Sequence, residues 1–360
     1  MNNNNGRLNY NGNLKSLSKY KFLDIKNFDK AESEIIVHNE SVIFFDNKGN
    51  LLKFNDKSKL DWKKNFYTKS EKKLGPILSM SLRDDILIVA DNLAKYYAID
   101  VISGNLIWER RNSSPINSQI KILNDKFYIV DYQNILRCFD INSGNELWNI
   151  QTENSFIKSK KKLSIALSND KIFFNNYIGD ITSVDINTGE ILWQTPTQKS
   201  SVYEDSFLLE TSDIVLNNGQ IFLSNNRNEF FSISQENGFV NWKTSIDSSM
   251  RPTIIDNLIF TVTSDGFLVI LESSTGKVIR STYIFDLLKK KKLKNLKPTG
   301  FIVGVNDIYL STNKGYLIKI NTMSGKSNSV IKIAGGKILR PYVSVNNLYI
   351  LKSNSIIKFN

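Results

Sequence analysis

Residues 185–193 read Asp-Ile-Asn-Thr-Gly-Glu-Ile-Leu-Trp, and variants of this stretch recur along most of the chain. The aspartate can accept backbone N–H bonds across a turn, and the glycine supplies a positive φ that other residues adopt only at a cost. The tryptophan can fold back against an adjoining unit and bury roughly 150–250 Å². The stretch therefore predicts a turn and an outer strand whose tryptophan packs between repeats, in preference to an aromatic floor for a ligand.

The copies differ in how much of this motif they keep. The well-preserved copies carry Asp100, Gly104 and Trp108, then Asp140, Gly144 and Trp148, then Asp185, Gly189 and Trp193, and a looser copy carries Gly238 and Trp242. An early copy ends in Trp62 and has Ser58 in place of the glycine, and two late copies keep Gly276 and Gly325 without the tryptophan. The glycine position recurs at intervals of 38 to 49 residues. Each unit also holds four short strand-like segments, which is typical of a β-propeller blade.

Several of the predicted middle strands are apolar at consecutive positions, as in residues 86–90 and 127–130. A sheet with one exposed face would alternate apolar and polar residues. A sheet that is packed on both faces is apolar throughout. The pattern therefore favours blades that are stacked against a neighbour on each side.

The two ends of the chain predict how the ring closes. After the last glycine turn come an outer strand at residues 329–333 and three more strands, near 342–345, 348–351 and 356–359. The last blade would lack its outermost strand, which the isolated strand-like segment at residues 20–25 can supply, and such closure removes an open sheet edge. The sequence predicts an all-β fold, an eight-bladed β-propeller of four-stranded antiparallel blades closed by an N-terminal strand. Seven blades are the alternative.

No composition break divides the repeats, so residues 20–360 are predicted to form a single β-propeller domain. Residues 1–19 are polar and rich in asparagine, and they are predicted to be a flexible leader. They lack the apolar core of a secretory signal and a cysteine for lipid attachment. No stretch approaches the roughly 18 consecutive apolar residues of a membrane helix.

Residue types that carry most catalysis and metal binding are scarce in this chain. His38 and Cys138 are its single histidine and single cysteine, which leaves almost no material for histidine-based catalysis, a disulfide or a cysteine metal cluster. Residues 325–327, Gly-Lys-Ser, resemble the end of a phosphate-binding loop, but Ile320 stands where that motif requires its first glycine. We therefore expect no catalytic, cofactor-binding or metal-binding residues.

The net charge of +12 comes mostly from lysines spread over nearly every repeat, which is typical of a biased composition more than of a binding stripe. Three segments interrupt the regular pattern: an acidic joint at residues 201–213 and lysine-rich segments at 158–162 and 289–297. The second lysine-rich segment is expected to form a short helix or a loop. For both lysine-rich segments, a solvated loop and a site for an acidic partner remain open.

The motif copies at residues 100–108, 140–148 and 185–193 closely resemble the repeat of pyrroloquinoline-quinone (PQQ) type propellers, whose outer hairpin reads aspartate, two variable residues, Thr/Ser-Gly, three residues and tryptophan. The resemblance spans residues 20–360. Among such proteins, a chain of this length with eight blades and an N-terminal closing strand resembles the BamB family of the outer-membrane β-barrel assembly machinery. That resemblance implies a non-enzymatic scaffold without a cofactor, at the periplasmic face of the outer membrane.

The same resemblance implies the partners. The family binds the periplasmic domains of BamA, so a BamA-like subunit and its associated subunits are expected, with peripheral membrane association, no nucleic acid, and one copy of the chain in a hetero-complex. The partner surface of the family includes an acidic segment at an inter-blade joint, which Asp205, Glu210 and Asp213 match in position and character. The chain departs from the family pattern in having no lipidation cysteine.

Two alternative functions stay open. A PQQ-dependent dehydrogenase is usually much longer, carries a calcium-binding set of carboxylates and asparagine, and often has a vicinal cysteine pair, whereas this chain has one cysteine. A general protein-interaction propeller would use its basic loops on an acidic partner.

Overall fold

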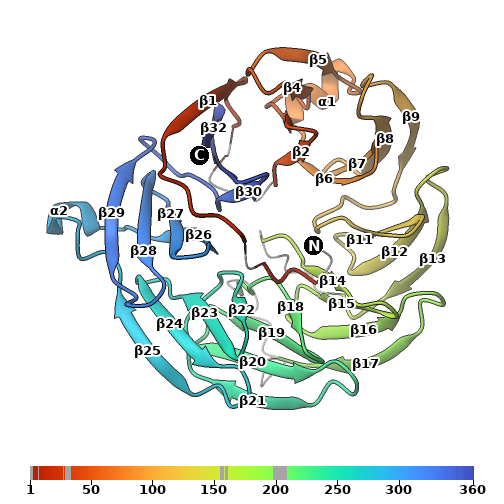
Figure 1. The fold of residues 1–360 in the computed structure, drawn as a ribbon. Coiled ribbons are helices and arrows are strands. Elements are labelled where there is room, and N and C mark those ends of the chain that lie inside the picture. The colour runs from red at the N-terminus through yellow and green to blue at the C-terminus, as the bar shows by residue number, and fades with distance from the viewer. Residues whose placement is uncertain are drawn as a thin grey trace.

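The computed structural model of the chain is a closed ring of β-sheets around a central axis (Figure 1). It describes residues 3–6, 8–26, 28, 34–154, 158, 161–197 and 209–360. Within these ranges the strands form eight four-stranded antiparallel sheets, and each sheet is a blade that extends from the axis to the rim. The predicted eight-bladed β-propeller is confirmed, and the seven-bladed alternative is wrong.

The blades follow one another in chain order, and within each blade the strands run in sequence from the axis outward. Blades 1 to 4 are β2 (Ile36–His38), β3 (Ser41–Phe45), β4 (Leu51–Phe54) and β5 (Leu60–Lys64); β6 (Leu78–Arg83), β7 (Ile86–Asp91), β8 (Lys95–Asp100) and β9 (Leu106–Arg111); β10 (Lys121–Leu123), β11 (Lys126–Val130), β12 (Ile135–Asp140) and β13 (Glu146–Gln151); and β14 (Ile165–Leu167), β15 (Lys171–Asn175), β16 (Ile181–Asp185) and β17 (Ile191–Thr195). Blades 5 to 8 are β18 (Val215–Asn217), β19 (Gln220–Asn225), β20 (Glu229–Ser234) and β21 (Val240–Thr244); β22 (Thr253–Ile255), β23 (Leu258–Val262), β24 (Phe267–Glu272) and β25 (Val278–Tyr283); β26 (Pro298–Val303), β27 (Asp307–Thr312), β28 (Tyr316–Asn321) and β29 (Ser327–Lys332); and β30 (Tyr342–Ser344), β31 (Asn347–Lys352), β32 (Ser355–Phe359) and β1 (Ser16–Lys21).

The N-terminal strand β1 closes the ring, as the sequence predicts. It pairs with β32 as the outermost strand of blade 8, and Figure 1 shows the red strand β1 beside the blue strand β32. The strand lies four residues earlier than the predicted segment 20–25, because Lys21 already pairs with Ser355, the first residue of β32. Beyond Lys21 no ladder partner is left, and the chain bends around the turn between β31 and β32, where the Ile25 amide donates to the carbonyl of Ser353.

The middle strands are buried on both faces. In β7, Leu87 and Val89 belong to the hydrophobic cluster shared with blade 1, whereas Ile88 and Ala90 belong to the cluster shared with blade 3. All four side chains are fully buried. Consecutive apolar residues are therefore required, since alternate side chains of one strand fill two different inter-blade cores.

The repeated motif forms the turn that the sequence predicts, and its tryptophan packs between blades as expected. Asp185 accepts hydrogen bonds from the amides of Asn187 and Thr188, both at 2.8 Å, which closes the turn. These bonds lower the pKa of the Asp185 carboxyl. Trp108, on the outer strand of blade 2, donates its indole N–H to the carbonyl of Ile141 in blade 3 at 2.9 Å. The tryptophan thus joins one blade to the next.

Two short helices lie in the described parts of the links between blades. The helix α1 (Lys69–Leu74) was not predicted, although Thr68 and Glu71 form a capping box that the sequence pattern Thr-x-x-Glu signals. The helix α2 (Lys290–Leu293) lies in the second lysine-rich segment, where a short helix or loop was expected. No helix in the described part of the chain is long and apolar enough to cross a membrane.

The connections between strands fall on two opposite faces of the ring, because successive strands are antiparallel. The links between blades, such as residues 112–120, lie where the innermost strands begin, and we call this side the connector face. The Asp-to-Gly turns of the repeat lie where the innermost strands end, and we call this side the turn face.

Candidate functional site: the axial cavity

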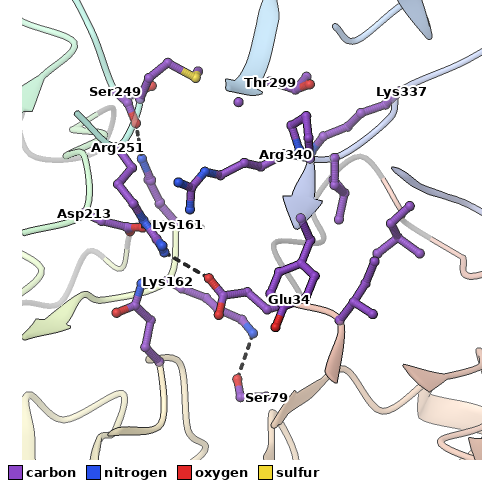
Figure 2. Close-up of a pocket in the computed structure, with 18 of the residues that line it drawn as sticks. Glu34, Ser79, Lys161, Lys162, Asp213, Ser249, Arg251, Thr299, Lys337 and Arg340 are labelled. Carbon is purple, nitrogen blue, oxygen red and sulfur yellow. Dashed lines mark hydrogen bonds and ion pairs between the residues drawn. The ribbon is translucent and has the colours of Figure 1, made fainter. Parts of the chain in front are cut away.

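A cavity of about 390 Å³ lies at the ring axis on the connector face (Figure 2). Residues from all eight blades line it, and most of them come directly before an innermost strand or at its start. Each blade therefore presents the last residues of its inter-blade link to the same space. This arrangement brings together side chains that are far apart in the sequence.

The wall of the cavity is strongly charged and predominantly cationic. The described residues that line it include six cationic and three acidic side chains, a formal excess of three positive charges. The cationic residues are Lys121, Lys161, Lys162, Arg251, Lys337 and Arg340, and the acidic ones are Glu34, Glu210 and Asp213.

Arg251, just before β22, is held by two carboxylates. Its Nη2 donates to Glu34 Oε1 at 2.9 Å, and its Nε forms an ion pair with Asp213. The side chains of Arg251 and Asp213 are only 14% and 18% exposed, so water screens this pair weakly. Burial opposes ionisation of Asp213, but the charge of Arg251 outweighs it and lowers the pKa of that carboxyl to about 2. Both carboxylates are therefore ionised at neutral pH, and Arg251 is fully compensated.

Two lysines of the first lysine-rich segment point into the cavity and tie blade 4 to other blades. Lys162 Nζ donates to the Ser79 hydroxyl of β6 at 2.7 Å, and Lys161 Nζ donates to the carbonyl of Ser249 (Figure 2). These residues are part of the cavity wall. Lys161 and Lys162 are half-buried there, and for the lysine-rich segment the choice between a solvated loop and a site for an acidic partner stays a prediction.

Arg340, just before β30, differs from Arg251 in making no ion pair with any acidic residue that the structure describes. Its Nε donates to the carbonyl of Phe301 at 3.0 Å, and its two terminal nitrogens make no hydrogen bond or ion pair with a described residue. Figure 2 shows its side chain extending toward Arg251, another cation. Burial, together with the charge of Arg251, lowers the pKa of the Arg340 guanidinium to about 9. The terminal nitrogens of this guanidinium therefore face the cavity without an ion pair to a described residue.

The N-terminal segment closes the channel behind the cavity. Leu8 donates its amide to the carbonyl of Val303 at the turn-face end of β26, and the chain then runs inward to Asn4, which is 3% exposed. Asn4 Nδ2 donates to the carbonyls of Ile165 and Ile214, each at 2.9 Å, and Asn4 Oδ1 accepts from Lys121 of the cavity wall. The described part of the predicted leader thus makes specific contacts inside the ring. The domain boundary at residue 19 stays a prediction.

The three residues predicted for partner binding have different positions. Glu210 is exposed at the cavity wall, and Asp213 is half-buried in its ion pair with Arg251. Asp205 lies outside the described residues. The acidic joint and the first lysine-rich segment, which appear unrelated in the sequence, line the same cavity.

The sequence prediction missed Glu34, Arg251 and Arg340. A signal for the arginines was present, since each stands directly before a proline that opens an innermost strand, in Arg-Pro pairs at residues 251–252 and 340–341. Nothing in the sequence indicated that Glu34 would reach Arg251 from a different blade, because that contact depends on ring closure.

The remaining candidate residues lie away from the cavity. His38 Nε2 lies 3.1 Å from Asp85 Oδ1 and joins blades 1 and 2, and Cys138 is a buried free thiol. Burial raises the pKa of the Cys138 thiol to about 12, so it is unreactive. Among the described residues, no group of three or more His, Cys, Asp or Glu side chains is arranged to hold a metal ion.

Comparisons with known proteins agree with this fold. The family model for outer membrane protein assembly factor BamB matches residues 39–282. The solved structure of BamB from Moraxella catarrhalis is similar, with a TM-score of 0.79 and 16% identity over 96% of this chain and 100% of that chain. Sqt1 from Saccharomyces cerevisiae has a TM-score of 0.74 and 12% identity over 96% of this chain and 98% of that chain. The computationally designed Ika8 protein has a TM-score of 0.70 and 10% identity over 97% of this chain and 100% of that chain. At such identities these likenesses show the shared fold alone.

No curated protein matches the sequence. The family match rests on the repeats themselves, because it begins in blade 1 and ends in the outermost strand of blade 6. It covers more than half of the chain, and the closed eight-bladed ring extends the agreement to both termini. The chain belongs to the BamB family of PQQ-type β-propellers.

Proposed function

We propose that this protein is a non-enzymatic scaffold subunit of the machinery that assembles outer-membrane β-barrel proteins, and that it binds the periplasmic domains of a BamA-like subunit. The observation that carries the proposal is the match of the BamB family model to residues 39–282. In this role the protein acts at the periplasmic face of the outer membrane, without a cofactor, as one copy in a hetero-complex.

The connector face is the surface that we propose for the partner. It carries the long links between blades, whereas the turn face carries mainly tight turns. Loops held by a rigid scaffold are where binding residues gather. Glu210 is exposed on this face, and Asp205 precedes it by only five positions in the sequence.

The three predicted contact residues divide into two roles. Glu210 has a free surface for a partner, and we keep Asp205 with it as a contact residue. Asp213 holds Arg251 inside the cavity, so we propose that it positions the joint instead of touching the partner. A charge reversal at Asp213 would disturb Arg251, and it is therefore unsuited as a test of contact.

The test is capture of purified BamA-like periplasmic domains by the full chain. We expect saturable capture that is weakened by Asp205→Lys with Glu210→Lys and unchanged by Glu236→Lys. Glu236 is a matched control because it is an exposed glutamate in a repeat turn on the opposite face. Absence of capture at tens of micromolar would contradict the assembly role and favour a general interaction propeller.

A PQQ-dependent dehydrogenase is the second candidate, because PQQ carries three carboxylates and the axial cavity is cationic. We expect no reduction of an electron-accepting dye when the protein is mixed with PQQ, Ca²⁺ and a panel of alcohols and sugars. Substrate-dependent dye reduction that needs both PQQ and Ca²⁺ would overturn the non-enzymatic assignment.

A further inference from the structure

The Arg340 side chain raises a question that the scaffold role does not answer. Its Nε is satisfied by the Phe301 carbonyl, and its terminal nitrogens face the cavity without a partner among the described residues. Proteins rarely enclose a guanidinium without a carboxylate, because removing an unpaired charge from water is costly. A structural role alone would be served better by an uncharged side chain.

The nearby acids are already engaged. Glu34 and Asp213 both bind Arg251, so neither provides a hydrogen bond to Arg340. Lys121, Lys161 and Lys162 add further positive charge around the same space. Glu34 and Asp213 act on Arg340 only at longer range, and among the described residues no carboxylate oxygen bonds its terminal nitrogens.

The size and closure of the cavity suit a small molecule. Its volume of about 390 Å³ falls in the range of small-ligand sites, roughly 300–1,000 Å³. Asn4 and its neighbours contact Gln119 and Lys121 of the cavity wall, so the channel is closed toward the turn face. Apolar side chains such as Met80, Met250 and Leu339 complete the wall. Among the described residues, the N-terminal segment lies on the turn-face side of the cavity, so a ligand would enter from the connector face.

We propose that the axial cavity binds a small multivalent oxyanion, a phosphate or carboxylate compound, through the terminal nitrogens of Arg340. A guanidinium presents two parallel N–H groups that match the two oxygens of a carboxylate or phosphate group. The cavity lysines supply the remaining positive charge. This inference does not depend on the proposed partner, since it concerns the isolated chain.

The affinity of this site for an anion is expected to fall as the pH rises. Burial lowers the pKa of Lys121 to about 8, and Glu34, Asp213, Arg251 and Arg340 are the charged groups that act on it. A bound anion favours the protonated lysine, so binding takes up protons near this pKa. Affinity is therefore full below about pH 7 and falls as pH rises through 8 to 9.

The test is isothermal titration of the full chain with inorganic pyrophosphate and with citrate, against sodium chloride of equal ionic strength. We expect saturable binding of at least one probe with a dissociation constant of about 1 mM or tighter. The stronger of the two probes identifies phosphate or carboxylate chemistry. Arg340→Gln weakens binding about tenfold or more, and Arg340→Lys weakens it less because the charge is kept.

Two controls separate a site from general attraction to a basic protein. Arg83→Gln removes an arginine on the turn face that is paired with Asp125, and it leaves binding unchanged. Thermal unfolding without ligand shows whether Arg340 is uncompensated: Arg340→Gln keeps or raises the melting temperature. Binding that survives Arg340→Gln, absence of binding by both probes, or a large loss of stability in ligand-free Arg340→Gln would each overturn the proposal.

Discussion

The indole of Trp108 in blade 2 lies against the backbone of Gly144 in blade 3, so closely that a β-carbon on Gly144 would sit 2.5 Å from the indole Cε3. The same relationship joins Trp62 to Gly104, Trp148 to Gly189, Trp193 to Gly238 and Trp242 to Gly276. The tryptophan of each blade thus packs against the motif glycine of the next blade. The two residues of one motif serve two different interfaces.

Gly144→Ala should destabilise the ring through contact with Trp108. Its φ is 71°, so the substitution carries backbone strain as well as the steric clash. Gly219→Ala is the matched control, because Gly219 has a φ of 72° and no atom within 4 Å of an added β-carbon. Overpacking costs about 1–3 kcal/mol, and we expect this difference between the two variants in the free energy of unfolding by urea. Equal costs would mean that the contact with Trp108 adds nothing.

Trp148→Phe should cost less than Trp242→Phe. Both indoles are half-buried against the next blade, but Trp242 donates its N–H to the carbonyl of Ser273 at 2.9 Å, whereas the Trp148 N–H is buried without a partner among the described residues. Loss of one hydrogen bond costs about 1 kcal/mol. Denaturant unfolding of both variants measures the difference, and a larger loss for Trp148→Phe would show that its N–H is paired.

Acid should weaken the cavity wall through Asp213. Its folded-state pKa of about 2 lies below the ordinary value of 3.8, so its ion pair contributes full stability above about pH 4 and loses it as pH falls toward 2. Asp213→Asn removes this contribution at neutral pH and leaves Arg251 with Glu34 alone. We expect the stability gap between wild type and Asp213→Asn to narrow from pH 5 to pH 2 in thermal melts. A constant gap would mean that the pair does not titrate in this range.

Asn4→Ala should destabilise the closed channel. The substitution removes the donor that serves the carbonyls of Ile165 and Ile214, at a cost of about 1–3 kcal/mol if they stay buried. Asn11→Ala is the control, because Asn11 is exposed in the same N-terminal region. Hydrogen exchange of the innermost strands β14 and β18 provides a local readout. Unchanged exchange in Asn4→Ala would show that the segment is not held in the channel.

The repeat pattern was sufficient to predict the architecture. Three features carried the prediction: the interval of 38 to 49 residues, the turn formed by Asp185 and Gly189, and the strands that are apolar on both faces. Each depends on interactions within one blade or between successive blades, and these interactions repeat along the chain. The missing outer strand of the last blade also predicted closure by the N-terminus. The bounds of β1 were shifted by four residues, since its register is set by the partner strand β32, and helix α1 was not predicted.

The cavity could not be predicted from the sequence, because it forms only when the ring closes. Glu34 and Arg251 come from blades 1 and 6, and Lys161 and Asp213 precede innermost strands of different blades. No sequence interval indicates that these side chains meet, because they converge only when eight blades close around one axis. The repeats specify the ring through local contacts, whereas the charges at its centre become neighbours through geometry.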